Sequence, residues 1–147
     1  MNAKEFKKTI NNCLVSNGFS KQGGFYYKSG PDVISVLGLQ KSNYDSCYYI
    51  NAGLVVKEIN PRLPFPQEAD GDIRFRLNFE LDGHETDCIK FEQISDSHNL
   101  SNILEKKITE FVNPSLDLKG LKDLLIKHPV LLYQTKLDAK KYLGIET

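Results

Sequence analysis

A strict alternation of apolar and polar residues runs from position 72 to position 81 and is the clearest strand signal in the chain. One face of this segment carries Ile73, Phe75, Leu77, Phe79 and Leu81, and the other carries Arg74, Arg76, Asn78 and Glu80. We therefore predict one continuous strand over 72–81, with one face buried and the other in solvent.

Three strand-like segments precede it, at 25–28, 33–40 and 47–57, and all are rich in aromatic or β-branched residues. Short connections between them favour an antiparallel meander. The following segment, 60–71, contains three prolines and is predicted to be a loop. A weaker strand is expected at 87–94.

Helical periodicity marks both ends of the chain. Near the N-terminus, four apolar residues recur at helical spacing: Phe6, Ile10, Cys13 and Leu14. Gly18 is expected to end this helix. Further helices are expected from Ser97 or Asn99 to about residue 112, at 117–127, and at 138–144. The order of elements predicts a single α+β domain over 1–147. It has an N-terminal helix, an antiparallel sheet of about five strands, and C-terminal helices packed on one face.

Composition places the chain among ordinary globular proteins, with 40% hydrophobic and 26% charged residues. No apolar run approaches the roughly 20 residues that span a bilayer, and the N-terminus lacks the apolar core of a signal peptide. Cys13, Cys47 and Cys88 are isolated from one another and odd in number, which argues against both a disulfide framework and a zinc site. A cytoplasmic protein is the expectation.

Charge changes this picture in one respect. The net charge is zero, which gives no support to a nucleic-acid binder, but residues 58–97 carry ten acids against four bases. These acids predict a negative patch that attracts a basic protein partner: Asp70, Asp72, Glu80, Asp82, Glu85 and Asp87. The alternative is an ordinary solvated face of a sheet and its turns.

Catalytic and metal-binding motifs are missing from the sequence. The three histidines, His84, His98 and His128, have no metal-ligand spacing, and Cys13 falls on the apolar face of a predicted helix. We therefore expect no enzyme activity and no cofactor or metal. A triad assembled from residues distant in sequence stays an open alternative that nothing in the sequence favours.

A second candidate site involves the polar face of the 72–81 strand. Arg74 and Arg76, about 7 Å apart along a strand, have the spacing to clamp a carboxylate or phosphate. Gln40, Tyr49 and Asn51 on neighbouring strands are candidates to complete an anionic-ligand or peptide site. The alternatives are cross-strand ion pairs for the arginines, and strand propensity or buried hydrogen bonds for the other residues.

Four short motifs carry a family resemblance: LQKS at 39–42, YYINAG at 48–53, RFRL at 74–77 and YLG at 142–144. As a set they resemble the bacterial family called domain of unknown function 4304, over roughly residues 3–144. The resemblance implies no activity, because the family has none established. Small bacterial proteins of this general kind include immunity proteins encoded beside toxins.

The leading hypothesis is a non-enzymatic protein-binding module, most plausibly an immunity protein that neutralises a cognate bacterial toxin with a basic surface. The alternative is a small anionic-ligand or peptide-binding protein that uses Arg74 and Arg76. Neither hypothesis involves nucleic acid or a membrane.

Overall fold

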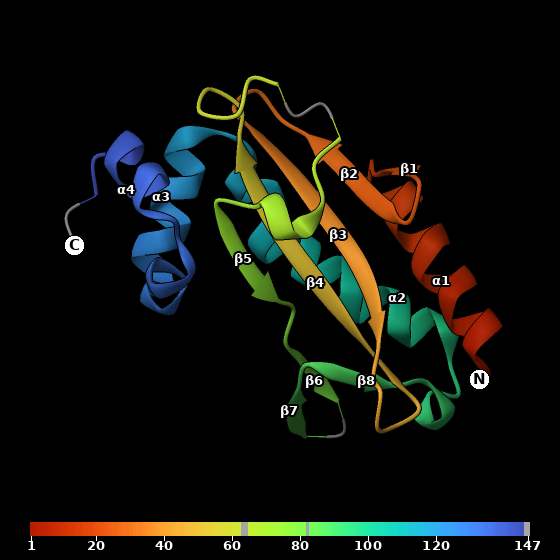
Figure 1. Ribbon diagram of the computed structural model, residues 1–147. Coiled ribbons are helices and arrows are strands. Elements are labelled where there is room, and N and C mark those ends of the chain that lie inside the picture. The colour runs from red at the N-terminus through yellow and green to blue at the C-terminus, as the bar shows by residue number, and fades with distance from the viewer. Residues whose placement is uncertain (63–64, 82, 146–147) are drawn as a thin grey trace.

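A computed structural model describes residues 1–62, 65–81 and 83–145 and shows helices packed against a twisted antiparallel sheet (Figure 1). The strands are β1 (Ser20–Gln22), β2 (Phe25–Ser29), β3 (Val33–Lys41), β4 (Cys47–Val56), β5 (Ile73–Arg76), β6 (Phe79–Leu81), β7 (His84–Thr86) and β8 (Cys88–Lys90). The α-helices are α1 (Ala3–Ser16), α2 (Ser97–Lys107), α3 (Leu118–Lys127) and α4 (Leu137–Leu143). Shorter helical segments are η1 (Glu68–Asp70), η2 (Phe91–Gln93), η3 (Ile108–Val112), η4 (Asn113–Leu116) and η5 (Pro129–Gln134).

The main sheet has six strands, in the order β1-β2-β3-β4-β5, with β8 also paired to β4. All its pairings are antiparallel. Strands β5 and β8 lie end to end along the same edge of β4, at residues 51–54 and 47–49 respectively. The remaining strands, β6 and β7, form a separate two-stranded hairpin.

All four α-helices cover one face of the sheet. Residues directly opposite one another on antiparallel strands point to the same face, so the register identifies that face as the one carrying Leu37, Ala52 and Phe75. Helices α1 and α2 pack on it around Phe6 and Leu104, in one hydrophobic cluster. Helices α3 and α4 pack on the same face in a second cluster. The predicted α+β class, with helices on one face, is confirmed.

The alternating segment at 72–81 is not one strand, and this prediction was wrong. It divides into β5 and β6, with a break at Leu77 and Asn78, because β8 occupies the next positions along the edge of β4. The apolar alternation still reports burial: Ile73, Leu77 and Phe79 are at most 1% exposed. Periodicity therefore identified the buried face but not the strand to which each half pairs.

The proline-containing loop crosses the face of the sheet opposite the helices. Within it, η1 lies over β3 and β4 (Figure 1) at the two strand glycines, Gly38 and Gly53. A Cβ atom added at Gly53 would lie 2.6 Å from the carbonyl oxygen of Glu68. Close approach of the η1 backbone therefore accounts for Gly53, whereas the Glu68 side chain occupies the space beside Gly38.

Helix boundaries follow local chemistry. The side chain of Asp96 caps α2 by accepting a hydrogen bond from the His98 N–H, and Asp117 caps α3 by accepting one from the Gly120 N–H. Gly18, with φ of 89°, follows α1 as expected. None of the helices in the described ranges combines the length and apolarity needed to cross a bilayer.

The contact between η1 and the sheet can be tested with one glycine substitution. We expect Gly53→Ala to lower the free energy of unfolding by about 1–3 kcal/mol, because the new methyl group meets backbone atoms of Glu68 that cannot move aside cheaply. Gly24→Ala is the matched control, since nothing lies within 4 Å of a Cβ there. Urea unfolding of both variants provides the measurement, and equal stability would contradict this packing.

Candidate functional site

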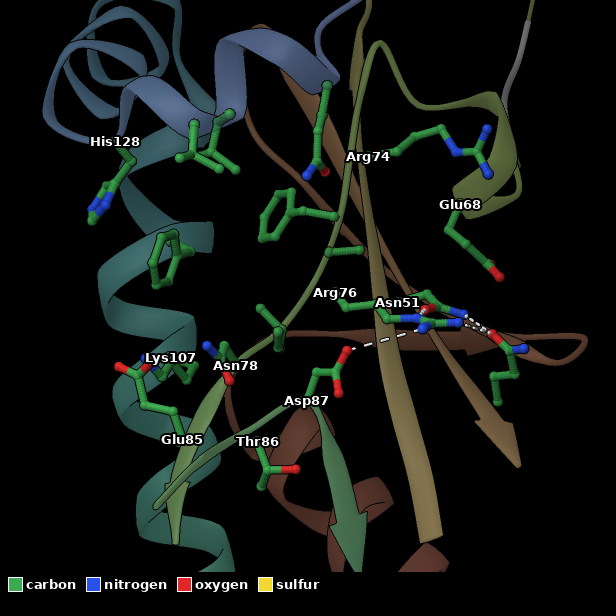
Figure 2. Close-up of a pocket in the computed structure, with 18 of the residues that line it drawn as sticks. Asn51, Glu68, Arg74, Arg76, Asn78, Glu85, Thr86, Asp87, Lys107 and His128 are labelled. Carbon is green, nitrogen blue, oxygen red and sulfur yellow. Dashed lines mark hydrogen bonds and ion pairs between the residues drawn. The ribbon is translucent and has the colours of Figure 1, made fainter. Parts of the chain in front are cut away.

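A groove of about 1280 Å³ surrounds the edge strand β5 (Figure 2). On the face opposite the helices it is lined by Gln40, Asn51, Glu68, Arg74 and Arg76. On the helical face it is lined by Phe75, Lys107, Phe111, His128, Val130, Leu131 and Gln134. One wall is therefore polar and charged, whereas the other combines apolar residues with Lys107, His128 and Gln134.

Arg76 stands at the centre of the polar wall. Its Nε donates a hydrogen bond to Asn51 Oδ1 at 3.1 Å, and its Nη2 donates one to Gln40 Oε1 at 3.3 Å. Asn51 Nδ2 also donates to Gln40 Oε1, at 2.8 Å. The guanidinium carbon lies 3.9 Å from the centroid of the Tyr49 ring, a stacking geometry that arginine favours. We call these four residues, Gln40, Tyr49, Asn51 and Arg76, the Arg76 array.

Strand register brings the array together. Gln40 lies directly opposite Tyr49, and Asn51 lies directly opposite Arg76. Because positions two residues apart in a strand share a face, Tyr49 and Asn51 present their side chains on the same side of β4. Four of the five residues proposed from the sequence as a ligand site are thus brought together, and Arg74 is the fifth.

The positive charge of Arg76 is only weakly compensated. Its one ion-pair partner among the described residues is Asp87, with 3.9 Å between Nη1 and Oδ2. Both side chains are about half exposed, at 43% and 50%, and exposed pairs of this kind contribute little to stability. The array therefore holds a guanidinium in place mainly through neutral acceptors.

Arg74 lies one pleat further along the same face, opposite Gly53. It is exposed and forms no ion pair with another residue in the described ranges. In Figure 2 its guanidinium extends toward η1, on the same wall as Arg76. Two arginines and the carboxylate of Glu68 therefore share this wall, and Asp87 also lines the groove.

Two buried polar atoms in the groove lack a hydrogen-bond partner, Glu68 Oε2 and His128 Nε2. Glu68 lies over Gly38. Burial, followed by the charges of Glu68 and Asp70, raises the pKa of the Tyr27 phenol. His128 ends α3, as predicted, and packs on Phe111 with 4.8 Å between ring centroids. The sequence offered no signal for Glu68, whose position depends on how the proline loop folds back.

The predicted acidic patch does not form one surface. Asp72 is 3% exposed, and its Oδ2 accepts hydrogen bonds of 2.8 Å from the Val56 N–H and from Asn60 Nδ2, so its role is structural. Asp87 faces Arg76, as described above. Asp82 lies outside the described residues.

Of the other acidic residues in the predicted patch, Asp70 lies in η1, whereas Glu80 and Glu85 lie on the β6–β7 hairpin. Asp70 accepts a hydrogen bond from the Gln67 N–H at the start of η1. Glu80 and Glu85 are exposed and lie directly opposite one another on the β6–β7 hairpin. Of the predicted patch, only Glu80 and Glu85 are exposed acidic side chains placed next to each other in the described structure.

The environment of Cys13 is that of a core residue. The Cys13 thiol is buried in the core, and burial, followed by the charge of Glu105, raises its pKa. A raised thiol pKa opposes formation of the nucleophilic thiolate. Within the described ranges, no group of His, Cys, Asp and Glu side chains has the geometry of a metal site.

Residues 10–118 match the family described as "Domain of unknown function (DUF4304)". The chain belongs to the DUF4304 family. The predicted resemblance is thereby confirmed. No curated protein and no solved structure matches the chain.

The DUF4304 match covers the whole sheet and the complete Arg76 array. It ends at the first residue of α3, so η5 and α4 lie beyond it. The polar wall of the groove therefore comes from the matched segment, whereas His128, Val130 and Leu131 on the opposite wall lie outside it.

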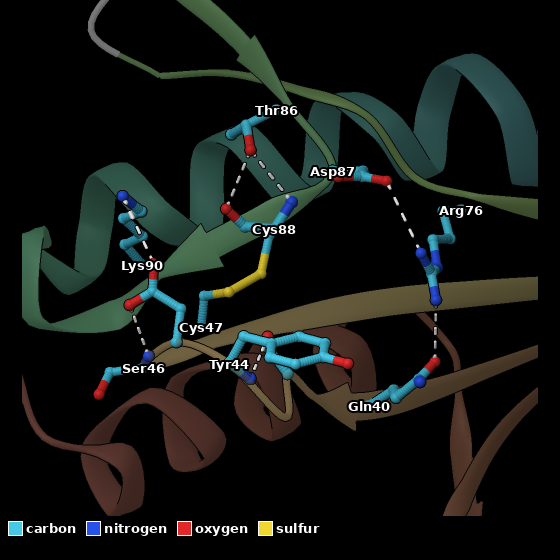
Figure 3. The surroundings of a disulfide bond; sticks show 11 residues. Gln40, Tyr44, Ser46, Cys47, Arg76, Thr86, Asp87, Cys88 and Lys90 are labelled. Atoms are coloured by element: carbon cyan, nitrogen blue, oxygen red, sulfur yellow. Dashed lines mark hydrogen bonds and ion pairs between the residues drawn. A yellow bond between two sulfur atoms is a disulfide. The ribbon is translucent and has the colours of Figure 1, made fainter.

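A disulfide joins Cys47 on β4 to Cys88 on β8 (Figure 3), although the odd number and isolation of the cysteines argued against a disulfide framework. Isolated in sequence, they become neighbours because Cys88 pairs with Tyr49, two residues from Cys47. The bond attaches β8 to the edge of β4, and Asp87 immediately precedes Cys88. Disulfides of this kind persist mainly in oxidising compartments, which removes one argument for the cytoplasmic expectation.

Removing this disulfide from the DUF4304 domain should be costly. The two cysteines are 41 residues apart in sequence, so the chain-entropy model gives a stabilisation of about 4 kcal/mol. We expect a Cys47→Ala/Cys88→Ala variant to unfold at markedly lower urea concentration than the oxidised protein. The variant's own stability should be unchanged by a reductant.

Thiol counting provides the control for this prediction. Denatured without reductant, the protein should react with one equivalent of alkylating reagent, at Cys13, and after reduction with three. Reaction of three thiols without reductant would contradict the disulfide.

Proposed function

We propose that this protein is a non-enzymatic binding protein whose ligand carries a carboxylate or phosphate held by Arg74 and Arg76. The observation that carries this proposal is the Arg76 guanidinium, which is oriented by two neutral amide oxygens and an aromatic ring while its closest carboxylate is 3.9 Å away. The guanidinium is therefore held in one orientation before a ligand binds, and its Nη1 can form a closer contact with an anion than the one it has with Asp87.

Pre-orientation matters because ordering a long side chain costs free energy on binding. Here Asn51, Gln40 and Tyr49 restrict Arg76 before the ligand arrives. Arg74, on the same wall and unpaired within the described ranges, supplies a second guanidinium. Guanidinium groups recognise carboxylates and phosphates through paired hydrogen bonds, which favours an anion over a neutral ligand.

Asp87 has a definite place in this proposal. Its carboxylate is the group nearest to the Arg76 guanidinium that resembles an incoming anion. A bound ligand would compete with it for Nη1. Asp87 therefore weakens anion binding in the resting protein.

Substitutions on either side of this ion pair should have opposite effects. We expect Arg76→Gln to weaken anion binding by about tenfold or more, as for loss of a charge-assisted hydrogen bond. Asp87→Asn should strengthen it by about two- to fivefold, because a competing surface charge is removed. Calorimetry with glutarate and with inorganic phosphate measures both effects.

Lys119→Gln, on the exposed surface of α3 and away from the groove, controls for loss of a positive charge. Equal weakening by Lys119→Gln and Arg76→Gln would show only a general charge effect and would count against this site. So would the absence of anion binding in the unmodified protein.

A toxin-neutralising role is the second candidate, and the β6–β7 hairpin is the observation that favours it. Glu80 and Glu85 lie directly opposite one another, both exposed, an arrangement in which like charges destabilise a strand pair. A basic partner would relieve that repulsion. This candidate requires a protein ligand at the hairpin, not an anion in the groove.

The hairpin candidate is tested by stability and by capture. Glu80→Gln should raise the free energy of unfolding by about 0.2–1 kcal/mol, because one of the facing charges is removed. Glu80→Lys/Glu85→Lys should abolish retention of a toxin domain in low-salt affinity capture from the native organism. Capture that is undiminished by this double substitution and insensitive to salt would rule out the electrostatic mechanism.

A further inference from the structure

The outer edge of β5 offers unpaired backbone groups to the groove. The Leu77 N–H donates to the Ile50 carbonyl at 2.9 Å, so Ile50 and Leu77 are a hydrogen-bonded pair of the β4–β5 ladder. Such pairs alternate along antiparallel strands, so Phe75 bonds toward β4 and the N–H and C=O of Arg76 point away from it.

The segment after η5 covers the first half of this edge, and the described chain leaves the Arg76 end open. Thr135 forms an isolated bridge beside Ile73, and the Lys136 N–H donates to the Asp72 carbonyl, so coverage is confined to the start of β5. The backbone N–H and C=O of Arg76 have no hydrogen bond to any described residue. An unpaired edge of this kind is a template on which an extended segment can add as a further strand.

The two walls of the groove specify what such a segment carries. Side chains of an added strand alternate between the faces of the sheet. Those on one face would lie beside Arg74 and Arg76. Those on the other would contact Phe75, Phe111 and Val130, of which Val130 is 66% exposed.

We propose that the groove binds an extended peptide segment of a partner protein, with alternating acidic and apolar residues, paired to the outer edge of β5. This inference rests on the proposed function, because the acidic side chains use the anion site at Arg74 and Arg76. It adds that the ligand's own backbone pairs with Arg76. A second copy of this chain fits poorly, since pairing β5 with itself would set arginines against arginines.

The register allows the contribution of backbone pairing to peptide binding to be measured separately from that of the acidic side chains. Residues directly opposite Arg76 in the added strand point to the same face as its guanidinium, so they are the acidic ones. These same residues exchange backbone hydrogen bonds with Arg76, whereas the apolar residues turn their N–H groups to the outside. Methylation of the backbone nitrogen at acidic or at apolar positions therefore distinguishes a strand-paired peptide from one held by charge alone.

The experiment uses a fluorescein-labelled peptide with alternating Glu and Val residues and blocked ends, with binding measured by anisotropy on the whole protein. N-methylation at two Glu positions should weaken binding by about tenfold or more, and the same change at two Val positions by less than about threefold. A peptide of the same composition with its Glu residues grouped together should bind more weakly than the alternating one. Arg76→Gln should weaken binding of the parent peptide.

Amide hydrogen exchange gives a residue-specific readout. The Arg76 amide should exchange rapidly in the free protein and become protected when the parent peptide is added, whereas the Phe75 amide should be protected in both states. Absence of Arg76 protection in the complex, or equal loss of affinity from the two methylation patterns, would overturn strand pairing. Failure of the parent peptide to bind at about 1 mM would also overturn it.

Small anions separate the two proposals. If glutarate or phosphate binds in an Arg76-dependent way while the alternating pattern makes no difference to peptide affinity, the anion site stands and strand pairing is wrong. If no small anion and no peptide binds, the proposed function itself fails.

Discussion

The structure depends on how one strand edge is shared. Strand β4 has ten residues, and its edge away from β3 is divided between β5 at residues 51–54 and β8 at residues 47–49. Neither strand alone could satisfy the backbone groups along this length, and buried strand edges require such pairing. The site follows from this division, because Arg76 is the last residue of β5 and Asp87 immediately precedes β8.

The same division explains the edge strand and the groove. The chain leaves β4 after Arg76, forms the β6–β7 hairpin and returns as β8, which the Cys47–Cys88 disulfide attaches to β4. The outer edge of β5 is covered at its start by Thr135 and Lys136 and is open at Arg76. The groove follows from this path of the chain around β5.

Charge is arranged unevenly around that edge. Carboxylates that the sequence groups together are put to separate uses: Asp72 supports backbone and side-chain donors in the interior, Asp87 faces Arg76, and Glu80 and Glu85 face one another. Arg76 is held instead by amide and aromatic groups. This separation distributes the carboxylates of an acidic segment over several places and leaves Arg76 with a single half-exposed ion-pair partner among the described residues.

The sequence by itself determined the elements whose signal is local. Periodicity identified α1 with its four buried residues, the capping and breaking residues identified α3, and strand composition identified β3 and β4. It also singled out Gln40, Tyr49, Asn51, Arg74 and Arg76 as candidates, but the register that brings four of them into contact comes from the structure. Only tertiary structure decided where each half of the 72–81 segment would pair, that Cys47 and Cys88 would meet, and that Asp72 would be buried. Each of these depends on contacts between residues far apart in the chain, and a pattern of local alternation is the same whichever distant strand supplies the partner.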